Sequence, residues 1–304
     1  MEIPPHIKNL YRHWGSYIIP RVSVPLSAVI KNESLNKEIE WFIHERISIW
    51  KKKISGAPPP YTNDAILSQY RFCNIFRECD KQTIEFHTLL NPLRDNFPLW
   101  LLNMFYCRMV ARTETIHNVG LLSFDEKSNK ELYKKLMSAP RPRFGTPYVF
   151  PISVLLRSET PTRELFITNY LPKIIPAIAE EIATWHEVSV YEGVRRILPL
   201  FGYNLSFLWT EVLIDVAYQF PERINLFGRF PVGPGALPTF KKIHPTQDPS
   251  VLAQELSTLD VDVGLTFERI PLRLSAENWE GIGCEFRKYT NLKAGKGRKR
   301  IYRA

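Results

Sequence analysis

The stretch FPLWLLNMFYCRMVAR, residues 97–112, carries apolar side chains on nearly every side of a helical wheel. A helix that is apolar all round is typical of the buried centre of a protein rather than of its surface. We therefore predict a central buried helix here and a mainly α fold, with at most a small β hairpin.

The segments on either side of this stretch repeat apolar residues at helical spacing. In residues 36–54 they recur at positions 39, 42, 43, 47, 50 and 54, as on one face of a helix. The same spacing predicts further helices at 64–72, 72–86, 128–138, 162–185, 189–201, 204–220, 251–260 and 278–289. The best strand candidate is PYVFPISV, residues 147–154, and its two prolines limit any sheet to a small one.

The 304 residues show no internal repeat and no linker long enough to force a domain boundary. We predict an N-terminal extension over 1–35, one helical domain over 36–290 and a basic C-terminal tail over 291–304. No apolar run approaches the roughly 18 residues that would cross a bilayer, and the N-terminus lacks the apolar centre of a signal peptide. We therefore expect no membrane partner and a reducing compartment.

Positive charge is concentrated at the C-terminal end. From Arg287 onward there are eight Lys or Arg and no acidic residue, which leaves 32 basic against 31 acidic residues elsewhere. Such a block either contacts a polyanion or stays solvated. The candidates for non-specific DNA-phosphate contacts are Lys296, Arg298, Lys299 and Arg300.

A glycine-containing turn lies in RFPVGPGALPTFKKI, residues 229–243. Gly233 and Gly235 lack a Cβ, so their amides can approach an anion closely, and the N-terminus of a following helix favours phosphate. Lys241 and Lys242 lie nearby. The alternative is a tight helix–helix turn that binds no ligand.

The sequence lacks the motifs of several classes of enzyme. It contains no G-x-x-x-x-G-K-[ST], no G-x-G-x-x-G after a strand, no H-E-x-x-H and no G-x-S-x-G. The chain is therefore not itself expected to be a P-loop kinase. The four cysteines form no C-x-x-C pair, so we predict no metal ligands and no cofactor, while a divalent cation in the reaction stays open.

Three segments in this order resemble one family. The first is HERISIWKKKISGAPPPYTNDAILSQYRFCNIFRECDKQT, residues 44–83; the second is FLWTEVLIDV followed by PVGPGA; the third is NWEGIGCEFRKYTNLKAGKGRKRIY, residues 278–302. Together they resemble the alpha-glutamyl/putrescinyl thymine pyrophosphorylase family. That family includes the helical domain of 5-hydroxymethyl-deoxyuridine DNA kinases and the amino acid:DNA transferases of bacteriophages.

The resemblance implies an enzyme that acts on double-stranded DNA with modified thymines. Members without a P-loop domain look like transferases that replace a pyrophosphate on the thymine 5-methylene with a free amino acid or polyamine. A 5-hydroxymethyl-dU DNA kinase would be the functional partner, and the cytoplasm of a phage-infected bacterium the location. A distant relation to DNA glycosylases implies a helix-hairpin-helix element whose turn, residues 231–236, holds DNA phosphates.

The predicted reaction needs cations beside the departing pyrophosphate. Candidates at positions that match the family pattern are Arg46, Arg71 and Arg77, with Lys288 in support. The alternative for each arginine is a structural ion pair. A flipped base would stack on an aromatic ring, for which Tyr61 is the candidate, where the family often has Trp.

The incoming amine must lose a proton, for which a carboxylate is suited. The candidates are Glu45, Asp64, Asp80, Asp215 and Glu285. Glu45 and Asp80 are candidates for an acid–base or a metal-binding role. Three of the carboxylates have a structural alternative: Asp64 could favour the dipole of its helix, Asp80 could pair with Arg77, and Glu285 with Lys288. Asp215 lies in an apolar helix, where a carboxylate needs a function or a buried partner.

Two other functions remain open at this point. A DNA glycosylase-like enzyme would need one carboxylate, such as Asp215, facing the sugar beyond the hairpin. A non-catalytic protein that binds modified DNA would have a cleft without a converging acid–base pair.

Overall fold

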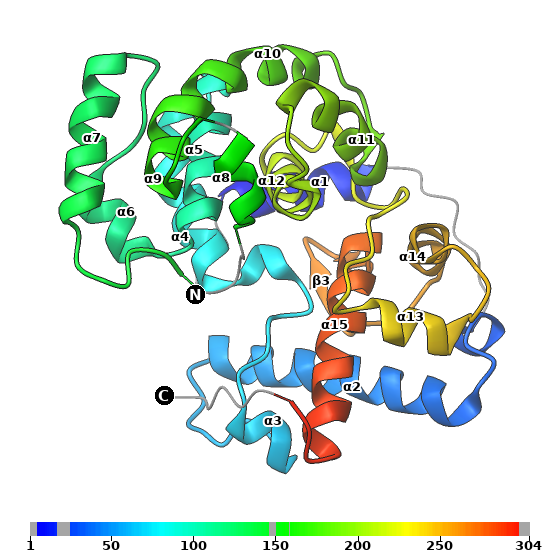
Figure 1. Ribbon diagram of the computed structural model, residues 1–304. Helices are drawn as coiled ribbons and strands as arrows, with labels where there is room; N and C mark the ends of the chain where they lie inside the picture. Colours follow the sequence, from blue (N-terminus) through cyan, green and yellow to red (C-terminus); the bar gives the residue numbers. More distant parts are fainter. Residues whose placement is uncertain (1–4, 17–24, 146–149, 158, 298–304) are drawn as a thin grey trace. The chain divides into compact units, whose positions relative to one another are not determined.

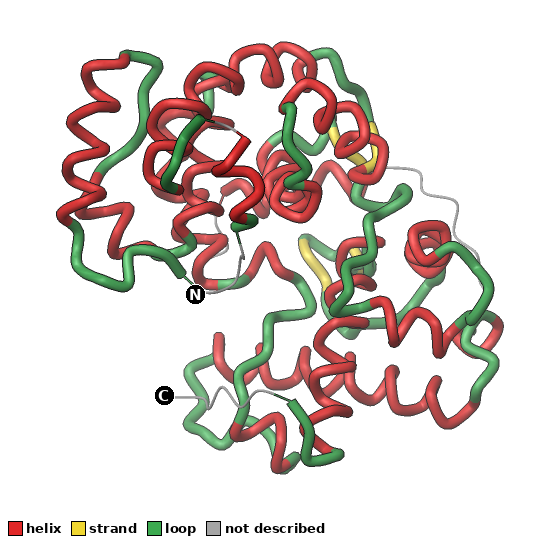
Figure 2. The backbone as a smooth tube through the Cα atoms, viewed as in Figure 1, coloured by secondary structure: helices red, strands yellow, loops and turns green. Residues whose placement is uncertain are grey.

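The computed structural model describes residues 5–16, 25–145, 150–157 and 159–297 (Figure 1). The chain divides into two compact units: unit 1 takes residues 1–80 and 226–304, and unit 2 takes residues 81–225. Helices dominate both units, and strands are confined to short pairs (Figure 2). The prediction of a mainly α fold is confirmed. None of the helices in the described ranges is both long and apolar enough to span a membrane.

Unit 2 is built around α5 (Phe97–Val110), the helix that the sequence predicts as central. Asn96 caps it by accepting the amide of Leu99 at 3.2 Å, and every residue from Trp100 to Val110 is buried. Helices α4, α6, α10 and α12 all pack against α5. The elements of unit 2 are α4 (Lys81–Leu90), η3 (Asn91–Leu93), α5, α6 (Thr113–Val119), α7 (Glu126–Ser138), α8 (Ile152–Arg157), α9 (Arg163–Leu165), η4 (Phe166–Tyr170), α10 (Leu171–Ala183), β1 (Val188–Ser189), α11 (Val190–Phe201), α12 (Ser206–Gln219) and β2 (Ile224–Asn225).

Unit 1 is built around α15 (Ala276–Lys293). A capping box between Ser275 and Asn278 starts this helix, which packs against α2, α3, α13 and α14. The Phe42 ring of α2 lies 5.6 Å from the Phe286 ring of α15 between centroids. The elements of unit 1 are α1 (Pro5–Ser16), η1 (Leu26–Ala28), α2 (Glu33–Ile54), α3 (Ala65–Gln69), η2 (Arg77–Cys79), α13 (Leu237–Ile243), α14 (Pro249–Thr258), β3 (Thr266–Phe267), β4 (Ile270–Pro271) and α15.

The strands form one pair in each unit. In unit 1, β3 and β4 are antiparallel, and Glu268 and Arg269 between them have φ of 46° and 69°. Two positive φ values suit a two-residue hairpin turn, and this hairpin is within the limit of at most a small β hairpin that was predicted. In unit 2, β1 and β2 are parallel.

Segment 72–86 is not the single helix that its apolar spacing predicts. Residues 71–76 are non-helical, and α4 begins only at Lys81. Side chains take the place of helical hydrogen bonds, because Arg46 binds the carbonyls of Phe72 and Cys73, and Asp80 accepts the amide of Asn74.

Three further predictions need correction or remain untested. The predicted strand is wrong where it is described, because Ile152–Arg157 forms α8; residues 146–149 lie outside the described ranges. The predicted extension contains α1, whose Tyr11 hydroxyl donates to Glu78 within unit 1. The predicted helix-hairpin-helix stays a prediction, since α12 ends at Gln219 and α13 begins only at Leu237, with β2 between them.

Candidate active site

Segment 71–80 is held between α2 and α15, and the family-motif residues meet along it. Arg46 of α2 is only 5% exposed. Its Nη2 donates to the carbonyl oxygens of Phe72 at 3.3 Å and Cys73 at 2.9 Å. Burial lowers the pKa of Arg46, and the nearby charge of Glu285 opposes that shift. Arg46 therefore holds the segment rather than facing solvent.

Glu285 and Lys288 of α15 hold the same segment from the other helix. Glu285 Oε2 accepts the amide of Cys73 at 3.1 Å and also lies 3.3 Å from Lys288 Nζ. Lys288 Nζ donates to the carbonyl oxygen of Arg71 and lies 4.4 Å from the centroid of the Phe72 ring. The pair is thus more than the surface ion pair offered as the alternative, because both members bind backbone atoms of the segment.

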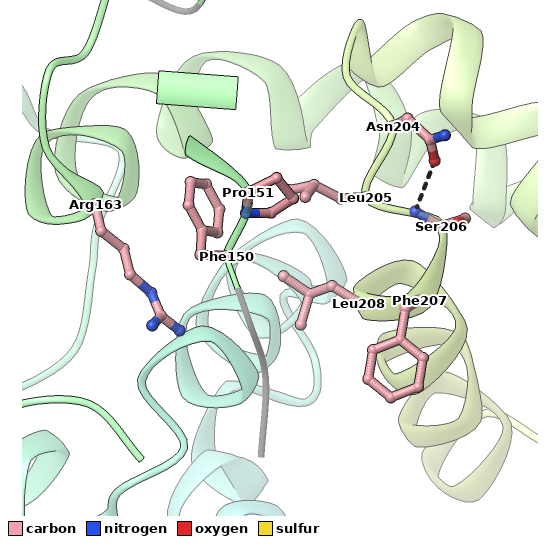
Figure 3. A pocket seen from close by; sticks show the side chains of 8 residues that line it. All are labelled: Phe150, Pro151, Arg163, Asn204, Leu205, Ser206, Phe207 and Leu208. Carbon is pink, nitrogen blue, oxygen red and sulfur yellow. Dashed lines mark hydrogen bonds between the residues drawn. The ribbon is translucent and has the colours of Figure 1, made fainter. Parts of the chain in front are cut away.

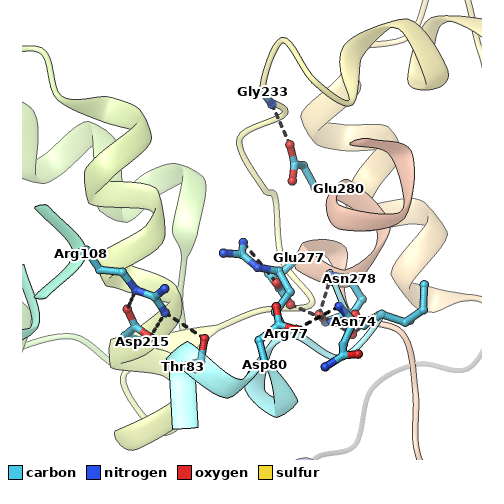
Figure 4. Close-up of polar contacts among 12 residues, drawn as sticks. Asn74, Arg77, Asp80, Thr83, Arg108, Asp215, Gly233, Glu277, Asn278 and Glu280 are labelled. Atoms are coloured by element: carbon cyan, nitrogen blue, oxygen red, sulfur yellow. Dashed lines mark hydrogen bonds and ion pairs between the residues drawn. The ribbon is translucent and has the colours of Figure 1, made fainter. Parts of the chain in front are cut away.

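Asp80 and Arg77 lie within segment 71–80 and make further polar contacts there (Figure 4). Asp80 Oδ1 accepts the amide of Asn74 at 3.0 Å. Burial raises the pKa of Asp80, while that amide and Arg77 oppose the shift. Arg77 Nη1 lies 3.7 Å from Glu277 Oε1, and the Glu277 side chain is almost completely buried. Arg77 is therefore engaged by a carboxylate that the sequence analysis did not single out.

Arg71 and Lys53 add positive charge beside this segment. Arg71 is exposed, and its guanidinium makes no hydrogen bond or ion pair with the residues that the structure describes. Lys53 lies 5.4 Å from the centroid of the Tyr61 ring. Burial lowers the pKa of Lys53, and the positive charges of Arg46 and Arg71 lower it further. Lys53 is not among the residues predicted from the sequence, although it lies two helical turns after Arg46 on the same face of α2.

An open pocket of about 430 Å³ lies beside α2. Glu45 and Asp64, two of the predicted carboxylates, line it together with Trp41, Lys52, Pro60, Thr62 and Asn63. Glu45 Oε1 accepts the hydroxyl of Thr62. Trp41, which the sequence analysis missed, is 41% exposed. Tyr61 is not among the lining residues.

Asp64 has a structural role as well as a place in the pocket. Its Oδ1 accepts the amides of Ile66 at 2.9 Å and Leu67 at 2.8 Å, which caps α3. Its Oδ2 accepts the hydroxyl of Tyr289 at 2.9 Å. Burial and this contact raise the pKa of Tyr289. The negative charge of Asp64 is thus placed in the pocket wall, with both oxygens already engaged.

Asp215 lies in unit 2 and is completely buried. Arg108 binds both of its oxygens at 2.6 Å (Figure 4). His87 Nε2 lies 3.0 Å from Oδ1. Burial alone would raise the pKa of Asp215, but Arg108 and His87 bring it down to about 2. These contacts correspond to the buried ion pair that the sequence left as the alternative, and a catalytic role for Asp215 stays a prediction.

The glycine turn packs tightly on α15. Gly233 donates its amide to Glu280 Oε1 at 3.2 Å. A Cβ at Gly235 would lie only 2.6 Å from the Sγ of Cys284. Both glycines therefore allow close approach to a helix, and phosphate binding by the turn stays a prediction.

The predicted DNA-binding cations differ in how far the structure describes them. Lys241 Nζ donates to the carbonyl oxygen of Pro245 at 3.0 Å, whereas Lys242 and Lys296 are exposed. Arg298, Lys299 and Arg300 lie outside the described residues. Among the described residues, no group of three or more His, Cys, Asp or Glu side chains is placed to hold a metal ion.

A smaller pocket of about 110 Å³ in unit 2 contains none of the predicted residues (Figure 3). Phe150, Pro151, Arg163 and residues 204–208 line it. The Arg163 guanidinium lies 4.2 Å from the Phe144 ring centroid and donates to the carbonyl oxygen of Met109. This arginine is thus already bound within its unit.

Comparison with known proteins places the chain in a family. A profile of the helical domain of 5-hmdU DNA kinase matches residues 33–299, which include every element of the site described above. The chain belongs to this family. The resemblance drawn from the three sequence segments is thereby confirmed.

Relatives of this family provide one detailed comparison. The 5-hmdU DNA kinase of Bacillus phage SP10 is 34% identical over 83 residues, which is 26% of this chain. The aligned stretch covers 13% of that kinase, so the chain corresponds to a small part of its length. No solved structure matches the chain.

Proposed function

We propose that the protein is a DNA hypermodification enzyme that transfers an amino acid or polyamine onto pyrophosphorylated 5-hydroxymethyluracil in DNA. In this reaction the bond between the 5-methylene carbon and the pyrophosphate oxygen breaks, and a carbon–nitrogen bond forms. Pyrophosphate leaves with the electron pair of the broken bond, and the amine gives up one proton. The observation that carries the proposal is the convergence of cations and carboxylates on segment 71–80 in a chain of this family.

The cations suit the departure of pyrophosphate. Arg71 is exposed and unpaired among the described residues, and Lys53 and Lys288 lie beside the same segment. Positive groups that are already in place where negative charge develops stabilise a transition state without rearrangement. Arg46 and Arg77 act indirectly in this proposal, because their guanidinium groups are engaged in holding the segment.

The carboxylates suit the incoming amine. Glu45 is the preferred proton acceptor because it lines the pocket and binds only Thr62 among the described residues. Asp64 adds negative charge to the same wall, whereas Asp80 and Glu285 orient the segment. Asp215 is not needed in this mechanism, since Arg108 and His87 occupy its oxygens.

The partners follow from the substrate. The DNA substrate is double-stranded and carries a pyrophosphorylated base, so a 5-hydroxymethyl-dU DNA kinase must act first, an activity that the relative from phage SP10 carries in its name. The 304 residues contain no P-loop, which is why we assign the transfer step to this chain. The setting is the cytoplasm of a phage-infected bacterium, and the turn at 231–236 with Lys242 and Lys296 contacts DNA phosphates.

The test is a single incubation, after which the masses of the nucleosides are measured. DNA containing 5-hydroxymethyluracil is pyrophosphorylated by a DNA kinase, mixed with the protein and a pool of amino acids and polyamines, and digested to nucleosides. An amine adduct with release of pyrophosphate supports the proposal. Arg71→Ala should lower the rate by about tenfold or more, the range of one lost charge-assisted contact, whereas the exposed control Arg195→Ala should leave it unchanged.

Two outcomes would contradict the proposal. Free base or abasic sites would assign a glycosylase-like reaction to the chain. Unchanged nucleosides together with salt-sensitive DNA binding would assign a non-catalytic binder of modified DNA.

A further inference from the structure

The pocket beside α2 has a charge opposite to that of the whole chain. Its wall combines the carboxylates of Glu45 and Asp64 with one ammonium group, that of Lys52. Lys52 Nζ is turned to the backbone, where it donates to the carbonyl oxygen of Tyr61 at 2.8 Å. The chain as a whole carries a formal net charge of +9. A negative pocket in a positive protein favours a cationic ligand and disfavours phosphate.

The pocket also has an aromatic wall. Trp41 is 41% exposed, and its ring lies 5.6 Å from the Tyr289 ring between centroids. Tyr289 in turn donates its hydroxyl to Asp64, which fixes the aromatic side of the pocket to the charged side. Trp41 and Glu45 are four residues apart on α2, so they share one face of the helix. An ammonium group near this face would interact with both the indole and the carboxylate.

Glu45 has one oxygen that receives no hydrogen bond from the described residues, whereas both oxygens of Asp64 are engaged. Asp64 accepts two amides and a hydroxyl, so both of its oxygens are engaged. Glu45 accepts only the Thr62 hydroxyl on Oε1, and its Oε2 receives no hydrogen bond from any residue in the described ranges. An ionised carboxylate accepts several hydrogen bonds, so the open oxygen of Glu45 is the point where a donor ligand binds.

We propose that this pocket binds a primary ammonium group on an aliphatic chain, with the ammonium on Glu45 and the methylene groups against Trp41. Its identification with the amine substrate rests on the proposed function, whereas the binding itself does not. The volume of about 430 Å³ accommodates a small aliphatic amine and some water. Diamines and amino acids share the ammonium group, and the negative wall favours the diamines, because they carry no carboxylate.

The binding test uses the full chain without DNA. Calorimetric titration with ethylenediamine through hexamethylenediamine should show binding, with glycine weaker, glutamate weaker still, and uncharged butanediol silent. Glu45→Gln should lower the affinity by about tenfold or more, because it removes a charge-assisted hydrogen bond. Trp41→Leu should lower it by about two- to fivefold, the size of an exposed cation–π contact.

A matched control variant distinguishes an effect of the pocket on amine affinity from a general effect of the charge of the chain. Glu40→Gln removes the same charge from an exposed position of α2 outside the pocket and should leave the affinity unchanged. Thermal unfolding of each variant checks that it folds. Equal losses in Glu45→Gln and Glu40→Gln would overturn the proposal, and so would absence of diamine binding to the folded wild-type chain.

The transfer assay then distinguishes this inference from the proposed function. Diamine binding that depends on Glu45, with no transfer of any amine to DNA, would keep the pocket and overturn the transferase. Transfer with an unchanged KM for the amine in Glu45→Gln and Trp41→Leu would keep the transferase and overturn the pocket. Loss of oligonucleotide binding, but not diamine binding, in Trp41→Leu would assign the indole to a DNA base and overturn the inference.

Discussion

Asp215 in unit 2 and Glu45 in unit 1 are both carboxylates on long helices, but their surroundings differ completely. Asp215 is fully buried, and three nitrogen contacts from Arg108 and His87 occupy its two oxygens. Glu45 lines an open pocket and binds a single hydroxyl among the described residues. A buried carboxylate with both oxygens engaged holds the fold, whereas one with an open oxygen at a solvent-accessible pocket is available to a ligand.

The largest expected effect comes from removing the arginine that binds the buried carboxylate of Asp215. Arg108→Met leaves the Asp215 carboxylate buried beside His87 alone, so we expect a loss of about 3–5 kcal/mol in the free energy of unfolding. Urea denaturation followed by circular dichroism measures this loss. The double variant Arg108→Met with Asp215→Leu should recover part of it, because no buried charge then remains unpaired. A loss below about 1 kcal/mol in the single variant would contradict a structural role for the pair.

Glu78 sharpens the comparison, because it is a buried carboxylate and no cation in the described part of the chain binds its second oxygen. Its Oε1 accepts the hydroxyl of Tyr11 at 2.8 Å, and Oε2 has no partner among the described residues. Burial raises the pKa of Glu78 to about 7. The protonated form is therefore favoured in the fold, and its contribution to stability is complete below the unfolded pKa of about 4.3 and is lost as pH rises to about 7.

Glu78→Gln tests this pH dependence. The variant should be more stable than the wild type at pH 8, by up to about 3 kcal/mol, because an amide replaces a carboxylate that must ionise. The two proteins should converge toward acidic pH, where Glu78 is protonated. Asp215 has the opposite sign: its pKa of about 2 means that its contribution is lost as pH falls through the acid range. Urea melts across pH would refute this assignment if Glu78→Gln shifted every midpoint equally.

The sequence predicted the centre of unit 2 better than the site in unit 1. The apolar side chains on all sides of residues 97–110 identify α5, because a helix that is buried on every side has no polar face. The apolar spacing over 72–86 also predicts a helix, yet segment 71–76 is not helical. Its carbonyl groups bind Arg46 and Lys288, which are far away in sequence, and local spacing contains no information about such contacts.

The candidate site shows the same limit. The resemblance named Arg46, Arg77 and Glu285, and the structure brings them to one segment, but their contacts with backbone and carboxylates depend on tertiary geometry. Trp41 and Lys53 were missed, although the helical spacing from Glu45 and Arg46 places them on shared faces of α2. Spacing around known motif residues was therefore the signal that could have found them.

The two glycines of the turn allow a second comparison, in which the expected changes in the free energy of unfolding are smaller. Gly235→Ala places a Cβ 2.6 Å from the Cys284 sulfur, so we expect a loss of about 1–3 kcal/mol from overpacking. Gly233→Ala meets only the end of the Glu280 side chain at 3.2 Å and should cost less than about 1 kcal/mol. Adding Cys284→Ala should rescue Gly235→Ala in a double-mutant cycle measured by urea denaturation. Failure of that rescue would show that Gly235 is needed for something other than packing.

The smallest expected effect concerns two neighbouring lysines of α13. Lys241 Nζ is bound to the carbonyl oxygen of Pro245, whereas Lys242 is exposed and makes no hydrogen bond or ion pair with the residues described. If the turn contacts DNA, Lys242→Ala should reduce the slope of log Kobs against log salt by about one, because one fewer counterion is released. Lys241→Ala should change the slope less, since its ammonium group must first leave the Pro245 carbonyl.

The exposed Lys173 of unit 2 is the matched control. Fluorescence anisotropy over a salt series measures all three slopes, and equal slopes for Lys242→Ala and Lys173→Ala would remove the turn and its helix from the DNA interface.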